Sequence, residues 1–206
     1  MRMKIDVHHL LPLLFEVNQL KRIPRMGWAV RGIGLADTES VAEHTYGMAL
    51  TALLLAELVD EPVDRGRLLT ICLLHDLPET QILDLVPAAV RYLTPAAKRR
   101  AEELALADLL SDLPSRQELQ ALWQEFEDGT TPEGRLARDA DKLDLMIQAT
   151  AYERAGWRQL GEFWQEMMKH DWEFPASQEL FRELAEQRAA RQCSPVRENQ
   201  ASGERR

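Results

Sequence analysis

The chain has 206 residues, of which 45% are hydrophobic and 6% aromatic, and its formal net charge is −9. This length suits one domain with a sizeable core and is short for two. The negative charge argues against a protein that binds nucleic-acid polymers, because such proteins need a basic face. Two cysteines predict no disulfide scaffold, and no uncharged stretch reaches the roughly 20 residues that span a bilayer. With no signal-peptide pattern, we expect a cytoplasmic protein that does not enter a membrane.

Proline, glycine and capping residues divide the first half of the chain into predicted helices. Leu- and Ala-rich stretches with frequent Glu and Arg favour helix over strand. In chain order, we expect a helix over Val7–Leu20, an ordered loop over Ile23–Glu39, a helix from the capping box Ser40–Glu43 to the turn Asp60–Pro62, and a helix from Asp64 to Asp76.

The second half continues the same pattern after a looser stretch through Pro87. The remaining predicted helices start at Thr94-Pro95, run from the capping box Ser115–Glu118 to Gly129 and from Thr131-Pro132 to Gly156, and cover Trp157–His170 and Ser177–Gln192. No strand or internal repeat is evident. We therefore predict an all-α, single-domain helical bundle over residues 1–192. Residues 193–206 lack apolar periodicity, which predicts a disordered tail.

Two histidines are placed where they can meet. His75 and Asp76 end an apolar run just before Pro78, where a helix must stop. His44 lies at a similar distance on the other side of the turn Asp60–Pro62. Two antiparallel helices joined at that turn put both histidines at the same level, because each histidine lies a similar number of residues, and so a similar helix length, from the turn.

The segment Arg135–Glu153 of the helix predicted from Thr131-Pro132 carries an acidic cluster. Its predicted buried stripe contains Leu136, Leu143, Ile147, Thr150 and Ala151. Asp141 and Asp144 lie near the edge of this stripe, and a shift in register would exchange Asp141 with Asp144 or with Asp139. Two imidazoles and two carboxylates together suit one divalent transition-metal ion.

These residues resemble those of a known family. Glu43-His44, His75-Asp76 and Asp141 resemble the pattern of the HD-domain metal-dependent phosphohydrolases, and in particular the 5′-deoxynucleotidase branch. The resemblance extends over about residues 15–161 and includes Leu20–Arg25 with Gly27-Trp28, Glu39–His44, Leu74–Asp76 with Glu79 and Asp84, Leu122–Glu127, and Gln148–Glu153.

The resemblance implies a metal site and a way of assembling. One divalent ion per chain would be held by His44, His75, Asp76 and Asp141. Mn²⁺ or Co²⁺ is favoured, and Mg²⁺, Fe²⁺, Ni²⁺ and Zn²⁺ also fit such a ligand set. The resemblance also implies a homodimer, for which apolar positions on the later helices offer a surface.

The resemblance further implies roles around the metal. Glu79 is the expected acid or base, and Asp84 a carboxylate that orients substrate or water. Arg25 is expected to contact the phosphate, with Arg31 as the alternative because the following loop is longer than the family pattern. Trp28 is expected to fill the space of a ribose 2′-hydroxyl, and a core anchor for the loop is the alternative.

The function implied is hydrolysis of (deoxy)ribonucleoside 5′-monophosphates to nucleoside and phosphate. One alternative is another HD-type hydrolase that acts on a nucleotide phosphodiester or pyrophosphate. Against it, Leu77-Pro78-Glu79 follows the His-Asp pair instead of glycine and lysine, and no histidine occurs between Asp76 and His170. A second alternative is a non-catalytic helical interaction module, which would need no such set of acids.

Overall fold

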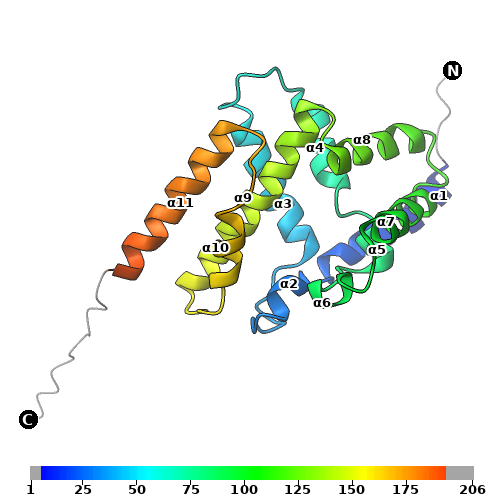
Figure 1. The fold of residues 1–206 in the computed structure, drawn as a ribbon. Coiled ribbons are helices and arrows are strands. Elements are labelled where there is room, and N and C mark those ends of the chain that lie inside the picture. Colours follow the sequence, from blue (N-terminus) through cyan, green and yellow to red (C-terminus); the bar gives the residue numbers. More distant parts are fainter. Residues whose placement is uncertain (1–5, 194–206) are drawn as a thin grey trace, which may run out of the picture.

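The computed structural model describes residues 6–193, which form helices joined by turns (Figure 1). Among these residues no strand occurs, and Pro24 and Ser40 form an isolated antiparallel bridge. The predicted all-α fold is confirmed. The elements are α1 (Val7–Val17), the 3₁₀ helix η1 (Asn18–Lys21), α2 (Met26–Ala29), α3 (Val41–Leu55), α4 (Arg65–Leu74), α5 (Glu79–Ile82), α6 (Pro87–Val90), α7 (Pro95–Leu109), α8 (Arg116–Asp128), α9 (Pro132–Arg154), α10 (Gly161–Met167) and α11 (Pro175–Cys193).

Helix starts follow the sequence where a capping side chain is in place. The Ser40 hydroxyl accepts a hydrogen bond from the Glu43 amide at 3.2 Å, and the Glu43 carboxylate accepts one from the Ser40 amide at 2.6 Å. This predicted capping box opens α3. The box predicted at Ser115 is wrong, although α8 does begin there. The Ser115 backbone, at φ −87° and ψ 7°, is not extended, and its hydroxyl caps no amide.

Some predicted limits differ from the structure. The predicted loop Ile23–Glu39 contains the short helix α2, and the looser stretch before Pro87 contains α5. The helix predicted over Trp157–His170 is reduced to α10, because residues 157–160 are not helical and Leu160 is its N-cap. Of the predicted disordered tail, Cys193 ends α11, and residues 194–206 lie outside the described part of the chain.

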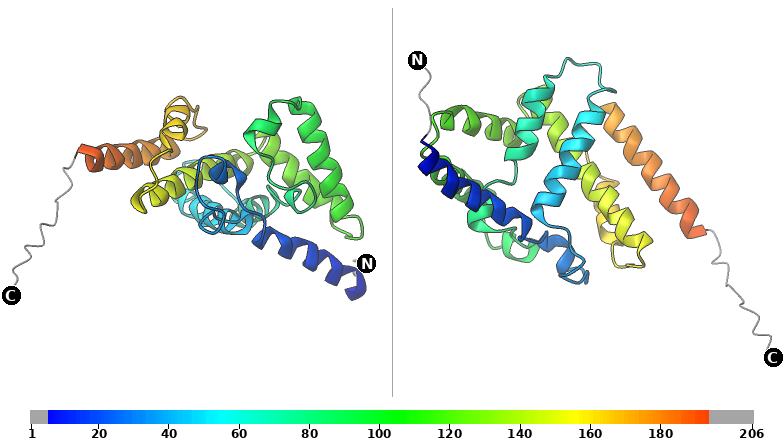
Figure 2. Two further views of the ribbon diagram at one scale, coloured as in Figure 1. Left: turned by 90° about the horizontal axis from the view of Figure 1, so that it is seen from below. Right: turned by 180° about the vertical axis from the view of Figure 1, so that it is seen from behind.

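Helix α9 is the centre of the packing. It contacts α3, α4, α8, α10 and α11. Helices α10 and α11 lie on one side of α9, and α1, α5 and α7 lie at the other end of the molecule (Figures 1 and 2). Met48, Leu68 and Leu143 are fully buried where α3, α4 and α9 meet. The functional residues predicted from the sequence lie on these same three helices or beside them.

The buried surface of α9 is wider than the predicted stripe. Leu136, Leu143 and Thr150 are buried as expected, but Ile147 is 43% exposed and Ala151 is also exposed. The prediction failed for these two residues because several helices contact α9 from different sides, so no single stripe describes its burial.

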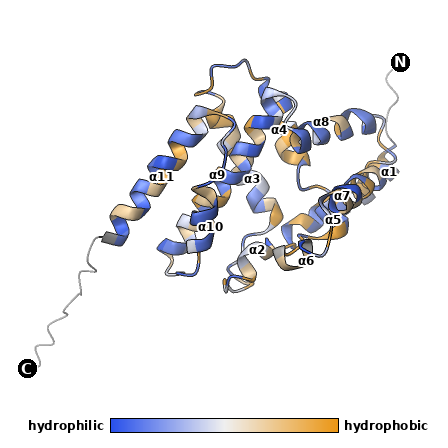
Figure 3. Ribbon diagram, in the orientation of Figure 1, coloured by the Kyte–Doolittle hydropathy of each residue, from blue (hydrophilic) through white to orange (hydrophobic). Residues whose placement is uncertain are grey.

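Hydrophilic and hydrophobic residues alternate along the helices (Figure 3). Within residues 6–193, no helix combines the length and apolarity that crossing a bilayer requires.

Candidate functional site

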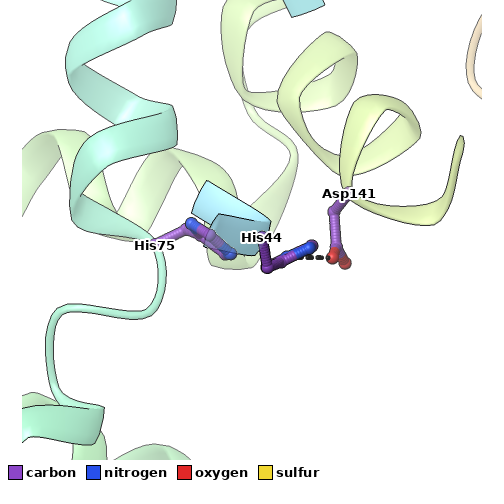
Figure 4. A group of neighbouring side chains, drawn as sticks. All are labelled: His44, His75 and Asp141. Carbon is purple, nitrogen blue, oxygen red and sulfur yellow. Dashed lines mark ion pairs between the residues drawn. The ribbon is translucent and has the colours of Figure 1, made fainter. Parts of the chain in front are cut away.

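Three helices bring the predicted metal ligands together (Figure 4). His44 lies near the start of α3, His75 follows the last residue of α4, and Asp141 lies in α9. His44 Nε2 is 3.1 Å from Asp141 Oδ1. One nitrogen or oxygen atom from each of the three residues lies within 4.8 Å of those from the other two. All three side chains are buried, so the sequence separation between them is bridged inside the protein.

Asp76 joins the same cluster from the turn after α4. Its Oδ2 is 3.0 Å from His75 Nε2 and 3.9 Å from His44 Nε2. Neighbouring residues on a helix point about 100° apart, so both members of the doublet can face one point only where the helix ends. Helix α4 ends at Leu74 and provides this end. We call His44, His75, Asp76 and Asp141 the His-Asp cluster.

The outer nitrogen of each imidazole is held by a hydrogen bond. His44 Nδ1 lies 2.8 Å from Asp144 Oδ2, and His75 Nδ1 lies 2.8 Å from the carbonyl oxygen of Cys72. The Nε2 atoms of both rings are buried and make no hydrogen bond of good geometry. Two inward nitrogens without such partners, beside two carboxylates, fit a divalent ion of borderline hardness.

The two carboxylates of the cluster are held in their charged form. Burial opposes ionisation of Asp76, but His75 and Arg25 hold the pKa of this carboxyl well below its usual range. Burial also opposes ionisation of Asp141, and the Lys142 ammonium more than compensates, so that its pKa too is low. The cluster therefore presents negative charge at neutral pH.

His44 is influenced by opposing effects. Burial and the Arg25 guanidinium disfavour the imidazolium, but the Asp141 and Asp144 carboxylates beside its two nitrogens prevail and raise the pKa of His44 to about 9. Metal ligation requires a neutral imidazole, so binding of a cation here releases protons.

Two cations border the cluster. Arg25 Nη1 lies 2.8 Å from Asp76 Oδ2, and its Nη2 lies 3.9 Å from Asp141 Oδ1. Lys142 Nζ lies 2.7 Å from Asp141 Oδ2. These two cations lie next to a carboxylate pair that could bind a metal. A guanidinium and an ammonium in this position can bind an anionic group such as phosphate.

Glu79 and Asp84 lie on the short segment after the doublet. Burial, with the charges of Asp76 and Asp84, raises the pKa of Glu79 to about 9, so this carboxyl holds a proton at neutral pH. Its Oε2 is buried and lacks a hydrogen-bond partner. Asp84 Oδ2 accepts a hydrogen bond from the Met26 amide at 2.6 Å and so fastens the loop that carries Arg25.

Two neighbouring cavities open beside the cluster. The metal cavity has a volume of about 410 Å³, and His75, Asp76, Glu79 and Asp141 line it. The aromatic cavity has a volume of about 350 Å³, and Trp28, Arg31, Leu145, Phe163 and Met167 line it. The residues that line both cavities are Arg25, Asp84, Leu85, Lys142 and His170.

Trp28 and Arg31 belong to the aromatic cavity. Trp28 is 1% exposed, and its indole Nε1 donates to Glu39 Oε1 at 2.6 Å. The centroids of the Trp28 and Phe163 rings lie 4.7 Å apart. The Arg31 guanidinium lies 3.9 Å from the centroid of the Phe163 ring and donates to the Gly27 carbonyl. The structure thus brings Arg25 to the His-Asp cluster and leaves Arg31 beside Phe163.

Sequence reasoning missed three contributors: Glu39, Lys142 and the contact of Asp144 with His44. The spacing of Asp144, three residues after Asp141, was a usable signal, because such residues share a helix face. The third acid, Asp139, instead accepts hydrogen bonds from the amides of Glu173 and Phe174 and fastens the segment that leads into α11.

Comparisons with known proteins agree with this geometry. The HD-domain family pattern matches residues 17–181. A Danio rerio protein, 5′-deoxynucleotidase HDDC2, is 36% identical over 147 residues, which are 70% of each chain. The 5′-deoxynucleotidase hdd1 of Schizosaccharomyces pombe is 32% identical over 162 residues, 75% of this chain and 78% of that one.

Solved structures are also similar. A conserved hypothetical protein from Pyrococcus furiosus has a TM-score of 0.73 and 37% identity, covering 85% of this chain and 99% of that chain. A predicted metal-dependent phosphohydrolase from Magnetospirillum magnetotacticum has a TM-score of 0.65 and 25% identity, covering 90% of this chain and 94% of that one. With the family pattern spanning most of its length and the His-Asp cluster assembled as its sequence predicts, this chain belongs to the HD-domain family.

Proposed function

We propose that this protein is a metal-dependent phosphohydrolase that cleaves deoxyribonucleoside 5′-monophosphates to deoxynucleoside and phosphate. The observation that carries the proposal is the His-Asp cluster, in which two buried imidazole nitrogens without good hydrogen-bond partners face two ionised carboxylates beside Arg25. The names of the relatives, 5′-deoxynucleotidases in Danio rerio and Schizosaccharomyces pombe, support this substrate class.

The four residues of the cluster would hold one divalent ion. The family resemblance favours Mn²⁺ or Co²⁺, and imidazole and carboxylate donors together also accept Mg²⁺, Fe²⁺, Ni²⁺ and Zn²⁺. When bound, such an ion polarises a phosphate oxygen and lowers the pKa of coordinated water. The protein supplies the fixed positions of the donors, because three packed helices hold them.

Arg25 would bind the phosphate, and Lys142 lies where it can assist. Both side chains line the metal cavity and the aromatic cavity, so a phosphate between them would lie next to the cluster. Charge spreading over the phosphoryl oxygens during cleavage would be stabilised by these cations. Asp84 would keep Arg25 in place through its hydrogen bond to the next amide, that of Met26.

The deoxynucleoside would then occupy the aromatic cavity. Trp28, held by Glu39, would limit the space beside the sugar, and Phe163 would form part of the apolar wall beside the base. Arg31, stacked on Phe163, would contact the nucleoside side of the substrate rather than the reacting phosphorus.

Glu79 would act as the proton donor. A carboxyl with a pKa of about 9 carries a proton at neutral pH and can pass it to the departing 5′-oxygen. In this step the oxygen of a water molecule would bond to phosphorus while the bond from phosphorus to the 5′-oxygen breaks. The Glu79 proton would leave with the deoxynucleoside hydroxyl, and the proton lost by the attacking water would restore the Glu79 carboxyl.

A phosphate-release screen tests the proposal. Deoxyribo- and ribonucleoside 5′-monophosphates are each incubated with the protein and one divalent ion at a time, with Asp76→Asn as the inactive control. We expect phosphate from the deoxynucleotides with Mn²⁺ or Co²⁺. Products from a phosphodiester or pyrophosphate alone would favour another HD-type hydrolase. If the protein bound no metal and formed no product, a helical interaction module would be favoured. The predicted homodimer needs a separate measurement, sedimentation equilibrium.

A further inference from the structure

We infer that Asp144, seated against Gly47, is a positioning residue that fixes the His44 imidazole with its Nε2 toward the metal site. The inference rests on the proposed metal binding by the His-Asp cluster, and it concerns a residue to which we gave no role in the reaction itself. The contact that suggests it joins two helices, α3 and α9, which pack closely against each other.

Helix α9 places a carboxylate beside each nitrogen of the His44 ring. Asp144 Oδ2 lies 2.8 Å from Nδ1, and Asp141 Oδ1 lies 3.1 Å from Nε2. Asp141 and Asp144 are three residues apart and therefore lie on one face of the helix. A carboxylate oxygen accepts hydrogen bonds, so the contact with Asp144 places the donor at Nδ1 and directs Nε2 toward the metal site.

Gly47 makes room for the Asp144 carboxylate. It lies one turn after His44 on α3, and a Cβ atom built there would be 2.2 Å from Asp144 Oδ1 and 2.9 Å from its Cγ. Glycine inside a helix lowers stability relative to alanine. Its presence in the middle of α3 is explained by this close approach, since any side chain would push the carboxylate away from His44.

The two histidines differ in what orients them. His75 Nδ1 is bonded to the carbonyl oxygen of Cys72 in its own helix α4, which is a neutral and local partner. His44 depends on a charged partner from another helix. Loss of the Asp144 contact should therefore affect His44 alone. Hydrogen-bond partners of metal-binding histidines are known to influence affinity strongly.

Two variants test this role by different routes. Asp144→Asn removes the charge, and Gly47→Ala displaces an intact carboxylate. The dissociation constant for Co²⁺ alone is measured by competition with a chelator, after circular dichroism has shown that each variant is folded. We expect both variants to raise this constant about 10- to 100-fold.

Matched controls separate positioning from general destabilisation. Asp139→Asn removes a buried carboxylate of α9 that accepts hydrogen bonds from the amides of Glu173 and Phe174, and Gly161→Ala adds a methyl group with no packing neighbour within 4 Å. Both controls should keep the affinity of the unmodified protein for Co²⁺. Unchanged affinity in folded Asp144→Asn and Gly47→Ala would overturn the inference.

The unmodified protein offers a further test that needs no folded variant. Nitrogen-15 spectra of the Zn²⁺-loaded protein should show the His44 ring protonated at Nδ1 and ligated through Nε2, and ligation through Nδ1 would overturn the inference. Metal binding with this ring state but without phosphate release from any nucleotide would count against the proposed function alone. Absence of Co²⁺ and Zn²⁺ binding would overturn both.

Discussion

The metal cavity and the aromatic cavity meet at Arg25 but differ in chemistry. One is lined by His75 and by several carboxyl groups, and burial and neighbouring charges displace the pKa values of Asp76 and Glu79. The other is lined by the apolar side chains of Trp28, Leu145, Phe163 and Met167, with Arg31 and Glu166 among them. The difference suggests a division in which charge on one side drives cleavage and shape on the other selects the nucleoside. Changes on the first side should lower the rate for every substrate, and changes on the second should alter preference.

The largest effect is expected at the His-Asp cluster. Asp76→Asn removes one of the two ionised carboxylates, and kcat/KM should fall ~10³-fold or more, because a metal ion contributes several kcal/mol to such a reaction. The fall should be equal for all nucleotides. Asp128→Asn, which removes a surface carboxylate paired with Arg99, serves as control and should retain activity. Equal activity in the two variants would refute the metal site.

Glu79→Gln should have the next largest effect. Loss of a positioned proton donor lowers kcat by about 10²- to 10⁴-fold. The activity of the unmodified enzyme should decline as pH rises through about 9, the pKa of Glu79, and the remaining activity of the variant should lack this decline. A variant that keeps the same alkaline decline would show that another group is responsible.

Stability measurements give an independent check on Glu79. Its pKa in the folded protein, about 9, is above the ordinary value of 4.5, so the folded state binds the proton more tightly than the unfolded state. The stability that the protonated carboxyl contributes is therefore complete below about pH 4.5 and is lost as pH rises toward 9. With metal removed by a chelator, urea unfolding of Glu79→Gln should lack this part of the pH dependence. Parallel curves for both proteins would contradict the raised pKa.

Arg25 and Arg31 allow a direct comparison of the two cavities. Arg25→Ala should lower kcat by about 10²-fold for all nucleotides, the size of effect seen when one donor to a developing charge is removed. Arg31→Ala should mainly raise KM, because its guanidinium stacks on Phe163 and does not contact the cluster. Steady-state kinetics on both variants decide which arginine meets the phosphate, and a larger loss of kcat in Arg31→Ala would reverse the assignment.

How far the sequence predicted the molecule depended on the range of each interaction. The cap formed by Ser40 and Glu43 depends on neighbours within one turn and was predicted correctly, whereas the box predicted at Ser115 was wrong. The approach of His44 to the His75-Asp76 doublet was expected from the similar lengths of the two segments that join these residues to the turn Asp60–Pro62. The Trp28–Glu39 bond and the Asp144–His44 contact depend on side-chain directions and helix packing; the spacing from Asp141 placed Asp144 on the same helix face but did not identify its partner. The prediction that Ile147 is buried failed for the same reason, because neighbouring helices decide which face of α9 is covered.

The smallest effect, and the one that separates the cavities best, is expected at Trp28. This ring is buried against Phe163 and its indole is fixed by Glu39, so it serves as a core anchor and can still limit the space beside the sugar. Trp28→Phe should lower the ratio of kcat/KM for deoxy- over ribonucleotides by about tenfold to 100-fold, the usual range for a change in pocket shape. Glu39→Gln keeps the ring and an acceptor oxygen, so it should lower the ratio less. The test is competition between dAMP and AMP. A uniform loss of rate for both nucleotides in Trp28→Phe would mean that Trp28 is only structural, and that the aromatic cavity does not select the sugar.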